Sequence, residues 1–211
     1  MKKLWIVLAA LLLSACVTTP PVKRDLSAFQ AAAPRSILVV PVINRSLDVD
    51  APNYVLAALP VPIAERGYYV FPVNTTKYVL EQEGLYEGEK IRQESPQALA
   101  GLFGADAILY VTIIRWDAQY AVLAATVTVE FDYRLVSKDG TEIWSEYRRM
   151  QYAPQNNNSG GGALGALISA VVSSAMTRAA PNYMPLTQQA NQQAFAQLPD
   201  GPYLPVAQKA K

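Results

Sequence analysis

Runs of apolar residues separated by turn signals divide the first half of the chain into strands and a helix. Residues 37–42 are apolar on both faces, which is typical of a strand buried between two layers. Residues 54–66 form a helical stretch that Pro60 and Pro62 must break or kink. Residues 68–73 are rich in aromatic and β-branched side chains and predict a second strand. A strand, a helix and a strand in succession predict a right-handed βαβ unit.

The clearest periodicity lies in the middle of the chain, from 107 to 152. Residues 107–114 are apolar on both faces and predict a central strand, whereas residues 122–136 alternate between apolar and polar side chains. Asp139-Gly140 predicts a hairpin turn into a third strand, 141–152, whose mixed charged faces suit a sheet edge. The alternation assigns one buried face and one solvated face to the middle strand. The buried face is Leu123, Ala125, Val127, Val129, Phe131, Tyr133 and Leu135, and the solvated face is Thr126, Thr128, Glu130, Asp132 and Arg134.

Further helices are predicted on either side of this meander. Residues 77–83 follow capping threonines, and a second helix begins at Ser95-Pro96 and ends at Gly104. Near the C-terminus, 163–178 is small and apolar and 187–198 is more polar. The prediction is an α/β fold, in which a mixed sheet (a βαβ unit and then a three-stranded antiparallel meander) is packed by helices. We expect a single domain at 35–211, with a C-terminal helical extension at 163–211.

The N-terminus has the pattern of a secretion signal. Lys2 and Lys3 precede an apolar run, Leu4 to Leu13, which is about half the ~20 residues that a membrane-spanning helix needs. The tetrad 13–16 (Leu-Ser-Ala-Cys) resembles the bacterial lipobox, which implies cleavage after residue 15 and acylation of Cys16. An ordinary cleaved signal with a chance cysteine is disfavoured, because Cys16 is the only cysteine and stands at the cleavage point.

The residues after Cys16 predict a lipid-bearing tether, 16–34, that joins the anchor to the domain. This segment carries three prolines and no strong apolar period. About eighteen flexible residues would span roughly 20–25 Å end to end. Val17 rather than Asp follows the cysteine, and by resemblance to other bacterial lipoproteins this favours the outer membrane over the inner membrane.

Composition argues against nucleic-acid binding and against the commonest kinds of catalysis. The chain has 18 basic and 17 acidic residues, and removal of Lys2 and Lys3 with the signal leaves 16 basic residues. The chain contains no His, which removes the commonest general base and metal ligand. It has no Gly-x-Ser-x-Gly elbow, and the glycine-rich loop at 154–162 lacks the Gly-Lys-Ser/Thr ending of a phosphate loop. We therefore expect no enzyme, no cofactor and no metal site.

Three smaller features are weighed individually. The cluster of Glu81, Glu83, Glu87 and Glu89 could supply paired carboxylates for catalysis, although a solvated acidic loop is the favoured interpretation. Gly161 and Gly165 have a spacing that permits helices to approach closely, which would suit membrane contact or helix-mediated assembly. Tight packing of helix 163–178 on the sheet is the favoured interpretation. A predicted turn at 117–119 places several polar and aromatic residues at a hairpin tip, where they could contact a partner or pack locally. These residues are Trp116, Asp117, Gln119 and Tyr120.

Three long segments carry a resemblance to a known family. They are 67–73 (Gly-Tyr-Tyr-Val-Phe-Pro-Val), 103–113 (Phe-Gly-Ala-Asp-Ala-Ile-Leu-Tyr-Val-Thr-Ile) and 180–186 (Ala-Pro-Asn-Tyr-Met-Pro-Leu). They resemble a family of bacterial outer-membrane lipoproteins of unknown function that includes a neisserial genome-derived antigen. More distantly, the order of elements is similar to the curli secretion lipoprotein CsgG, the synthase activator LpoB and the N-terminal domain of TolB. The resemblance implies a layered α/β fold and a role in the cell envelope, and it implies no catalytic residues.

The functional prediction is a non-enzymatic, lipid-anchored protein of the outer membrane that faces the periplasm. It would act through contacts with envelope proteins, including other lipoproteins, as a component or accessory of an assembly or export system. Whether the chain forms a homo-oligomer is left open. The alternative function is a binding module for a small envelope ligand, such as a glycan or a peptide. A hydrolase has the least support, because the usual pairs of nucleophile and base are missing.

Overall fold

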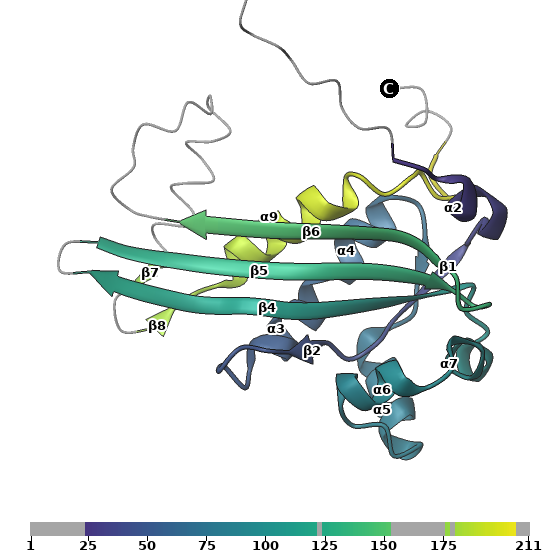
Figure 1. Ribbon diagram of the computed structural model, residues 1–211, viewed down its shortest axis with the longest axis horizontal. Helices are drawn as coiled ribbons and strands as arrows, with labels where there is room; N and C mark the ends of the chain where they lie inside the picture. Colours follow the sequence, from purple (N-terminus) through teal and green to yellow (C-terminus); the bar gives the residue numbers. More distant parts are fainter. Residues whose placement is uncertain (1–23, 122–123, 153–175, 178–179, 206–211) are drawn as a thin grey trace, which may run out of the picture.

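Three long strands form the body of the molecule, with helices packed against them (Figure 1). The computed structural model describes residues 24–121, 124–152, 176–177 and 180–205. The long strands are β4 (Ala107–Ala121), β5 (Ala124–Ser137) and β6 (Glu142–Tyr152), joined as an antiparallel meander. The short strands are β1 (Ser36–Val39), β2 (Ile43–Asn44) and β3 (Tyr69–Val70). The predicted signal, 1–15, and Cys16 lie outside the described residues.

The sheet is mixed, as predicted. Its order is β3-β1-β4-β5-β6, with β2 also paired to β4. Strand β1 is parallel to both β3 and β4, as a βαβ unit requires, and β6 lies at the edge of the sheet. The fold class predicted from the periodicity is therefore confirmed.

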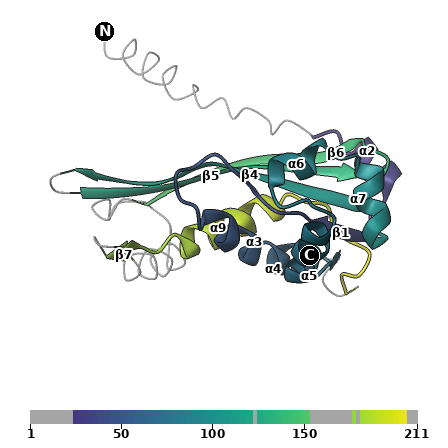
Figure 2. The ribbon, with the colours of Figure 1, turned by 90° about the horizontal axis from the view of Figure 1, so that it is seen from below.

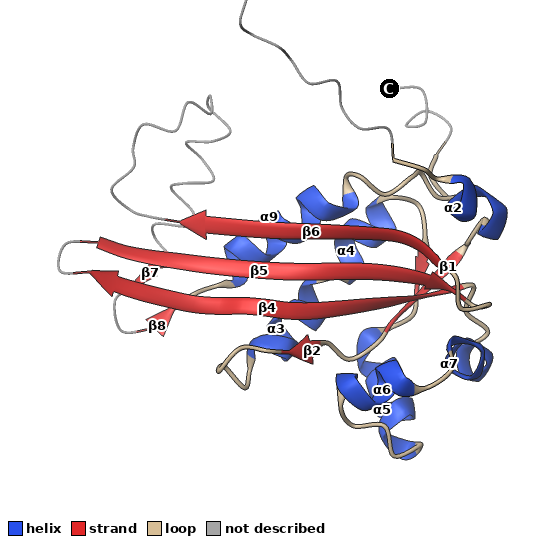
Figure 3. Ribbon diagram, in the orientation of Figure 1, coloured by secondary structure: helices blue, strands red, loops and turns tan. Residues whose placement is uncertain are grey.

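Helices pack on both faces of the sheet, although on one face they cover only β1 and the start of β4 (Figures 2 and 3). Strand β1 separates two cores, because Ile37 and Val39 face one side while Leu38 and Val40 face the other. The larger core lies under α3, α4 and α9, and the smaller one under α5, α6 and α7. The helices are α2 (Ser27–Ala32), α3 (Ala51–Ala58), α4 (Pro60–Glu65), α5 (Val73–Gln82), α6 (Gly88–Gln93), α7 (Pro96–Phe103) and α9 (Met184–Phe195).

The ends of α7 and the break between α3 and α4 follow from local sequence signals. The Ser95 hydroxyl accepts a hydrogen bond from the Ala98 amide at 3.1 Å, and Pro96 begins α7. Gly104 ends the same helix at φ +69°, a conformation that suits glycine. Leu59 separates α3 from α4, so the proline-bearing stretch forms two helices as expected.

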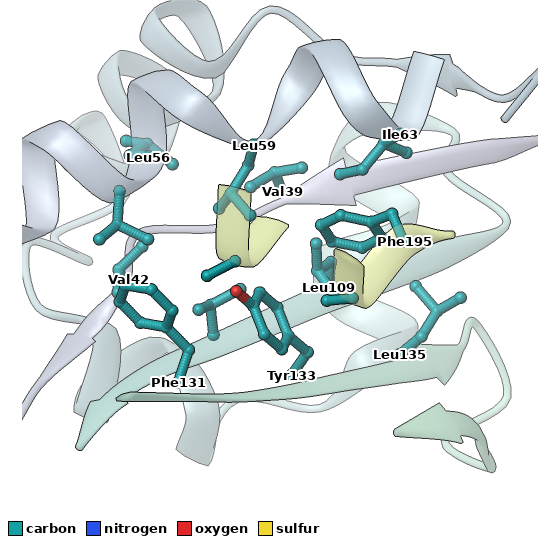
Figure 4. Packing of buried hydrophobic residues seen from close by; sticks show 14 of the residues in the cluster. Val39, Val42, Leu56, Leu59, Ile63, Leu109, Phe131, Tyr133, Leu135 and Phe195 are labelled. Atoms are coloured by element: carbon teal, nitrogen blue, oxygen red, sulfur yellow. The ribbon is translucent and has the colours of Figure 1, made fainter. Parts of the chain in front are cut away.

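The larger core is centred on the inner face of β5 (Figure 4). Phe131 and Tyr133 are fully buried there, and the Tyr133 ring meets Phe195 of α9 edge to face with centroids 5.5 Å apart. The Tyr133 hydroxyl donates to Asn191 Oδ1 at 2.7 Å, which satisfies a polar group deep in the core. Burial also raises the pKa of Tyr133 well above its usual value. The polar C-terminal helix predicted at 187–198 is therefore an essential wall of the core.

The folded part begins earlier than predicted, because α2 lies within the range assigned to the tether. Phe29 is buried, and its ring meets Tyr68 edge to face at 6.4 Å. Leu26, Ala28 and Ala32 pack beside Phe29 against the same core, and a buried Phe alone contributes about 1.5–3 kcal/mol, so this short helix is docked. Near the C-terminus, strand pairing replaces part of a predicted helix. Met176–Thr177, predicted as the end of a helix, pairs as β7 with β8 (Ala180–Pro181). The rest of the predicted helix lies outside the described residues, as do Gly161 and Gly165.

The predicted turn at 117–119 is wrong, because β4 continues to Ala121. A register shift between Ile113 and Arg115 adds one residue to the strand and reverses the alternation beyond it. The inner face accordingly passes from Ile113 to Trp116. In the sequence alone, the change in the alternation of inward and outward side chains looks like the end of the strand, and hence like a turn.

Two further expectations need correction. Thr128, predicted on the solvated face, is only 2% exposed, and its hydroxyl accepts a hydrogen bond from Gln151 Nε2 at 3.3 Å. Thr128 lies between Asp117 of β4 and Gln151 of β6, whose longer side chains cover it. A short side chain can therefore be buried even on the outer face of the sheet. The acidic stretch from Glu81 to Glu89 is not only a loop, since Glu81 lies in α5 and Glu89 lies in α6, whose Ile91 inserts into the smaller core.

The C-terminal residues pass along the turn at Gly67 in very close contact with it. The Gly201 amide donates to Arg66 O at 2.7 Å, and the Tyr203 amide donates to Gly67 O at 3.0 Å. Arg66 also donates to Leu198 O at 2.6 Å. A Cβ on Gly201 would lie 2.3 Å from Gly67 O, so this approach requires glycine.

The face assignment of β5 generates the first prediction. Val129→Asp places a carboxylate in the larger core and should destabilise the protein by about 3–5 kcal/mol. Ser145→Asp adds the same charge to the exposed outer face, opposite Arg134, and should change stability by no more than about 0.5 kcal/mol. Urea unfolding followed by circular dichroism measures both. Equal losses would contradict the assignment.

The close approach at Gly201 generates the second prediction, with a glycine elsewhere as its control. Gly201→Ala must displace the C-terminal residues and should cost about 1–3 kcal/mol. Gly101→Ala lies in α7 with open space around it and should instead gain roughly 0.5–1 kcal/mol from helix propensity. The midpoint of thermal unfolding should therefore fall for one variant and rise for the other. A rise for Gly201→Ala would show that the contact is not restrictive.

Candidate functional site

An open cleft of about 580 Å³ lies where the loop after β2 meets the start of α9. Its walls come from segments that are far apart in the chain: the loop and the first turn of α3, the inner face of β4, and the turn that enters α9. The lining residues are Asp48, Asp50, Tyr54, Trp116, Asn182, Tyr183 and Met184. This volume is within the range of small-ligand sites, about 300–1,000 Å³.

Side-chain hydrogen bonds to the backbone shape the loop that forms one wall. Asn44 Oδ1 accepts from the Ser46 amide at 3.0 Å, and Asn44 Nδ2 donates to Asp48 O at 2.8 Å. Asp48 Oδ1 in turn accepts from the amides of Asp50 and Ala51, at 2.9 and 3.2 Å. Such bonds from Asn and Asp are typical of tight turns, and here they lead directly into α3. The loop therefore has a defined shape.

Trp116 is the floor of the cleft. It is 5% exposed, and its indole Nε1 donates to Asp48 Oδ2 at 3.1 Å. Its ring stacks on Tyr183 with centroids 4.7 Å apart, and on Tyr54 at 6.4 Å with the planes nearly parallel. Tyr54 is half exposed, so an aromatic surface continues from the core to the solvent.

The rim of the cleft is both acidic and apolar. Neither Lys nor Arg is among the residues that line it, whereas two carboxylates are. Leu47 and Val49 alternate with these carboxylates along the loop, and their exposed fractions are 101% and 83%. Large aliphatic side chains exposed to this degree, beside an aromatic cleft, are typical of a surface that contacts a partner.

The structure separates the four residues predicted at a hairpin tip. Trp116 points into the core side of β4 and reaches the cleft, whereas Asp117 faces the opposite side and pairs with Arg115 at 2.9 Å. The hydrogen bond to Asp117 is the main cause that raises the pKa of Arg115. Gln119 is exposed, and the side chain of Tyr120 lies outside the described part. The sequence does not single out Asp48 or Tyr54, and it marks Tyr183 only as part of the family-like segment 180–186.

A second group of charges lies at the other end of the sheet, where the N-terminal segment meets edge strand β6. Arg24 forms an ion pair with Glu146, and its guanidinium lies 6.0 Å from the centroid of the Trp144 ring. Arg148 also pairs with Glu146, at 2.9 Å. The Glu146 side chain is 8% exposed, so this charge is largely buried and held by two cations. The group attaches the N-terminal segment to β6.

Two further features are absent from the described ranges of the chain. Among those residues, no three His, Cys, Asp or Glu side chains gather in a way that could hold a metal ion. No helix in the same ranges is both long enough and apolar enough to cross a membrane.

Comparison with known proteins identifies relatives over nearly the whole described chain. A family profile described as "Putative lipoprotein GNA1162-like" matches residues 24–204. The "Putative lipoprotein NMB1124/NMB1162" of Neisseria meningitidis serogroup B is 41% identical over 174 residues, which are 82% of this chain and 80% of that protein.

A solved structure of a relative agrees with this relationship. The crystal structure of lipoprotein GNA1162 from Neisseria meningitidis is 39% identical and has a TM-score of 0.56; the match covers 67% of this chain and 97% of that one. The C-terminal domain of LpoB from Salmonella enterica is 22% identical, covers 60% of this chain and 93% of that domain, and has a TM-score of 0.35.

The hydrogen bonds of Asp48 generate the third prediction. Asp48→Ala leaves the buried Trp116 indole and two backbone amides without their acceptor, and should cost about 2 kcal/mol. Asp50→Ala removes a neighbouring carboxylate that makes no capping bond to α3, and should cost less than about 0.5 kcal/mol. Urea unfolding monitored by tryptophan fluorescence distinguishes them. Similar losses would show that the charge of the loop, and not these bonds, holds its shape.

Proposed function

Because this chain belongs to the family of GNA1162-like lipoproteins, we propose that it is a lipid-anchored, periplasm-facing protein of the outer membrane that acts through protein contacts rather than catalysis. The anchor of the proposal is Cys16, acylated after removal of residues 1–15. Multiple acyl chains hold a protein stably, at about 0.8 kcal/mol for each buried methylene. Val17 after the cysteine favours the outer membrane.

The attachment of the N-terminal segment supports a defined orientation of the domain. Arg24 is held on β6 by Glu146 and Trp144, so only residues 17–23 separate it from Cys16. The described N-terminal residues leave the domain near α2, at the opposite end of the sheet from β7 and β8 (Figures 1 and 2). This arrangement would present the cleft away from the point of anchoring.

The observation that carries the proposal of protein contacts is the rim of the cleft. Leu47 and Val49 are almost fully exposed on a loop whose backbone is fixed by hydrogen bonds. A shaped loop that presents aliphatic side chains beside a half-exposed Tyr54 has the features of a recognition surface. The carboxylate of Asp48 is engaged in holding that loop, which favours a structural role for it over general acid or base chemistry.

The cleft also favours one second candidate, the binding of a small envelope ligand. A volume of about 580 Å³ with aromatic and carboxylate walls could accept a sugar or a short peptide. This function and protein contact make different demands, since a small ligand needs only the cleft, whereas a protein partner would also cover Leu47 and Val49.

The fourth prediction tests the anchor and the contact together in living cells. With a photo-crosslinking amino acid in place of Tyr54, irradiation should give a discrete protein adduct from the outer-membrane fraction. The same substitution at Tyr78, an exposed tyrosine on α5, should not give that adduct. Cys16→Ser should abolish both the acyl mass of the mature protein and the adduct.

Several outcomes would count against the proposal. Acyl-free wild-type protein by intact-mass analysis would reject the anchor. Sedimentation of the wild type with inner membranes would reject the location. Equal crosslinking from Tyr54 and Tyr78, or none from either, would reject a protein contact at the cleft and favour the small ligand.

A further inference from the structure

The two carboxylates at the cleft have no cationic partner among the residues that the structure describes. Carboxylates on the long strands do have cationic partners: Asp117 pairs with Arg115, Glu142 with Arg134, and Glu146 with both Arg148 and Arg24. Asp48 instead accepts three hydrogen bonds from neutral N–H groups, and Asp50 is exposed at the start of α3. The cleft therefore has a negative potential that this part of the chain does not compensate.

The cation nearest along the sequence is directed elsewhere. Arg45 begins the same loop, but its guanidinium lies 3.9 Å from Glu89, on the side of α6. No Lys or Arg is among the described residues that line the cleft.

Aromatic and acidic groups lie together at the start of α3. Asp50 is the N-cap of α3 and Tyr54 lies in its first turn; the Tyr54 amide donates to Asp50 O at 3.4 Å, and both residues line the cleft. An Arg or Lys side chain placed there would meet a carboxylate and the face of a phenol ring, the two groups that best bind such cations. Leu47 and Val49, beside them, suit aliphatic neighbours of that cation.

We propose that the cleft binds a positively charged, extended segment of a partner protein, with an Arg or Lys side chain between Asp50 and the ring of Tyr54. The apolar residues that flank this cation pack on Leu47 and Val49. This inference rests on the proposed function, protein contact at the cleft, and specifies the chemistry of the partner.

Trp116 supplies a direct reporter for the test. The chain has three tryptophans, of which Trp5 lies in the predicted signal. In a Trp144→Phe background, the fluorescence of the mature lipidated protein in a non-ionic detergent therefore reports on the floor of the cleft. The probe is the peptide acetyl-Leu-Arg-Leu-Arg-Leu-amide, and its control carries citrulline, a neutral analogue of the same shape, in place of arginine.

The arginine peptide should change the Trp116 emission, and the citrulline peptide should bind about tenfold more weakly because it lacks the charge. Asp50→Asn should weaken the arginine peptide about fivefold, and added salt should weaken it further. Asp139→Asn removes the same charge from the distant β5–β6 hairpin and should have no effect. Tyr54→Phe keeps the ring and should bind within about twofold of the parent, whereas Tyr54→Leu should lose roughly two- to fivefold.

Equal binding of the arginine and citrulline peptides would overturn the proposal, as would no change in Trp116 emission with either. Equal effects of Asp50→Asn and Asp139→Asn would also overturn it. These results are distinguishable from failure of the proposed function. If the Tyr54 crosslink to a protein persists while the peptides bind equally, protein contact stands and the cationic assignment falls. If the arginine peptide binds selectively but no protein adduct forms, the preference of the cleft for a cation stands and the proposed contact with a protein falls.

Discussion

Burial of the inner face of β5 under α9 is the interaction on which the rest of the structure depends. Phe131 and Tyr133 would be exposed to water if the C-terminal helix did not lie across them, and Phe195 and Asn191 are the residues that complete the contact. The sheet is formed in the middle of the chain and is closed by α9 from near its end, so the larger core is complete only when both are in place. The close approach of the C-terminal residues to the turn at Gly67 fixes the end of the same closure.

The cleft follows from this packing. Once α9 lies on the inner face of β5, its first turn must reach the neighbouring strand β4, and this brings Tyr183 onto Trp116. The loop after β2 also reaches Trp116, because β2 pairs with Thr112 and Ile113 of β4, just before that residue. Asp48 then joins the two by accepting the Trp116 indole hydrogen. The recognition surface is therefore positioned by the core and not by the loop alone, which favours a defined shape before any partner binds.

The edge of the sheet is protected at the point where the anchor segment arrives. Strand β6 carries Glu146 and Arg148 on its inward side, where most sheets carry apolar residues, and inward charges discourage pairing with further strands. Arg24 adds a second cation to Glu146, which balances a largely buried carboxylate. The same contact fixes where the proposed tether leaves the domain, so one group of charges both blunts the edge and orients the molecule.

The sequence alone determined the order of elements, the meander, the covered central strands and the capped helix α7, because periodicity and capping are local properties. It also singled out Trp116 and segment 180–186, but it could not bring them together. Only the tertiary structure placed Tyr54, Asp48 and Tyr183 around Trp116, since contacts between distant segments leave no local pattern. The register shift after Ile113 hid the continuation of β4, because one added residue reverses which side chains face the core. Phe29 and Met176–Thr177 were misassigned for a related reason: packing and strand pairing outweigh the propensity of short segments.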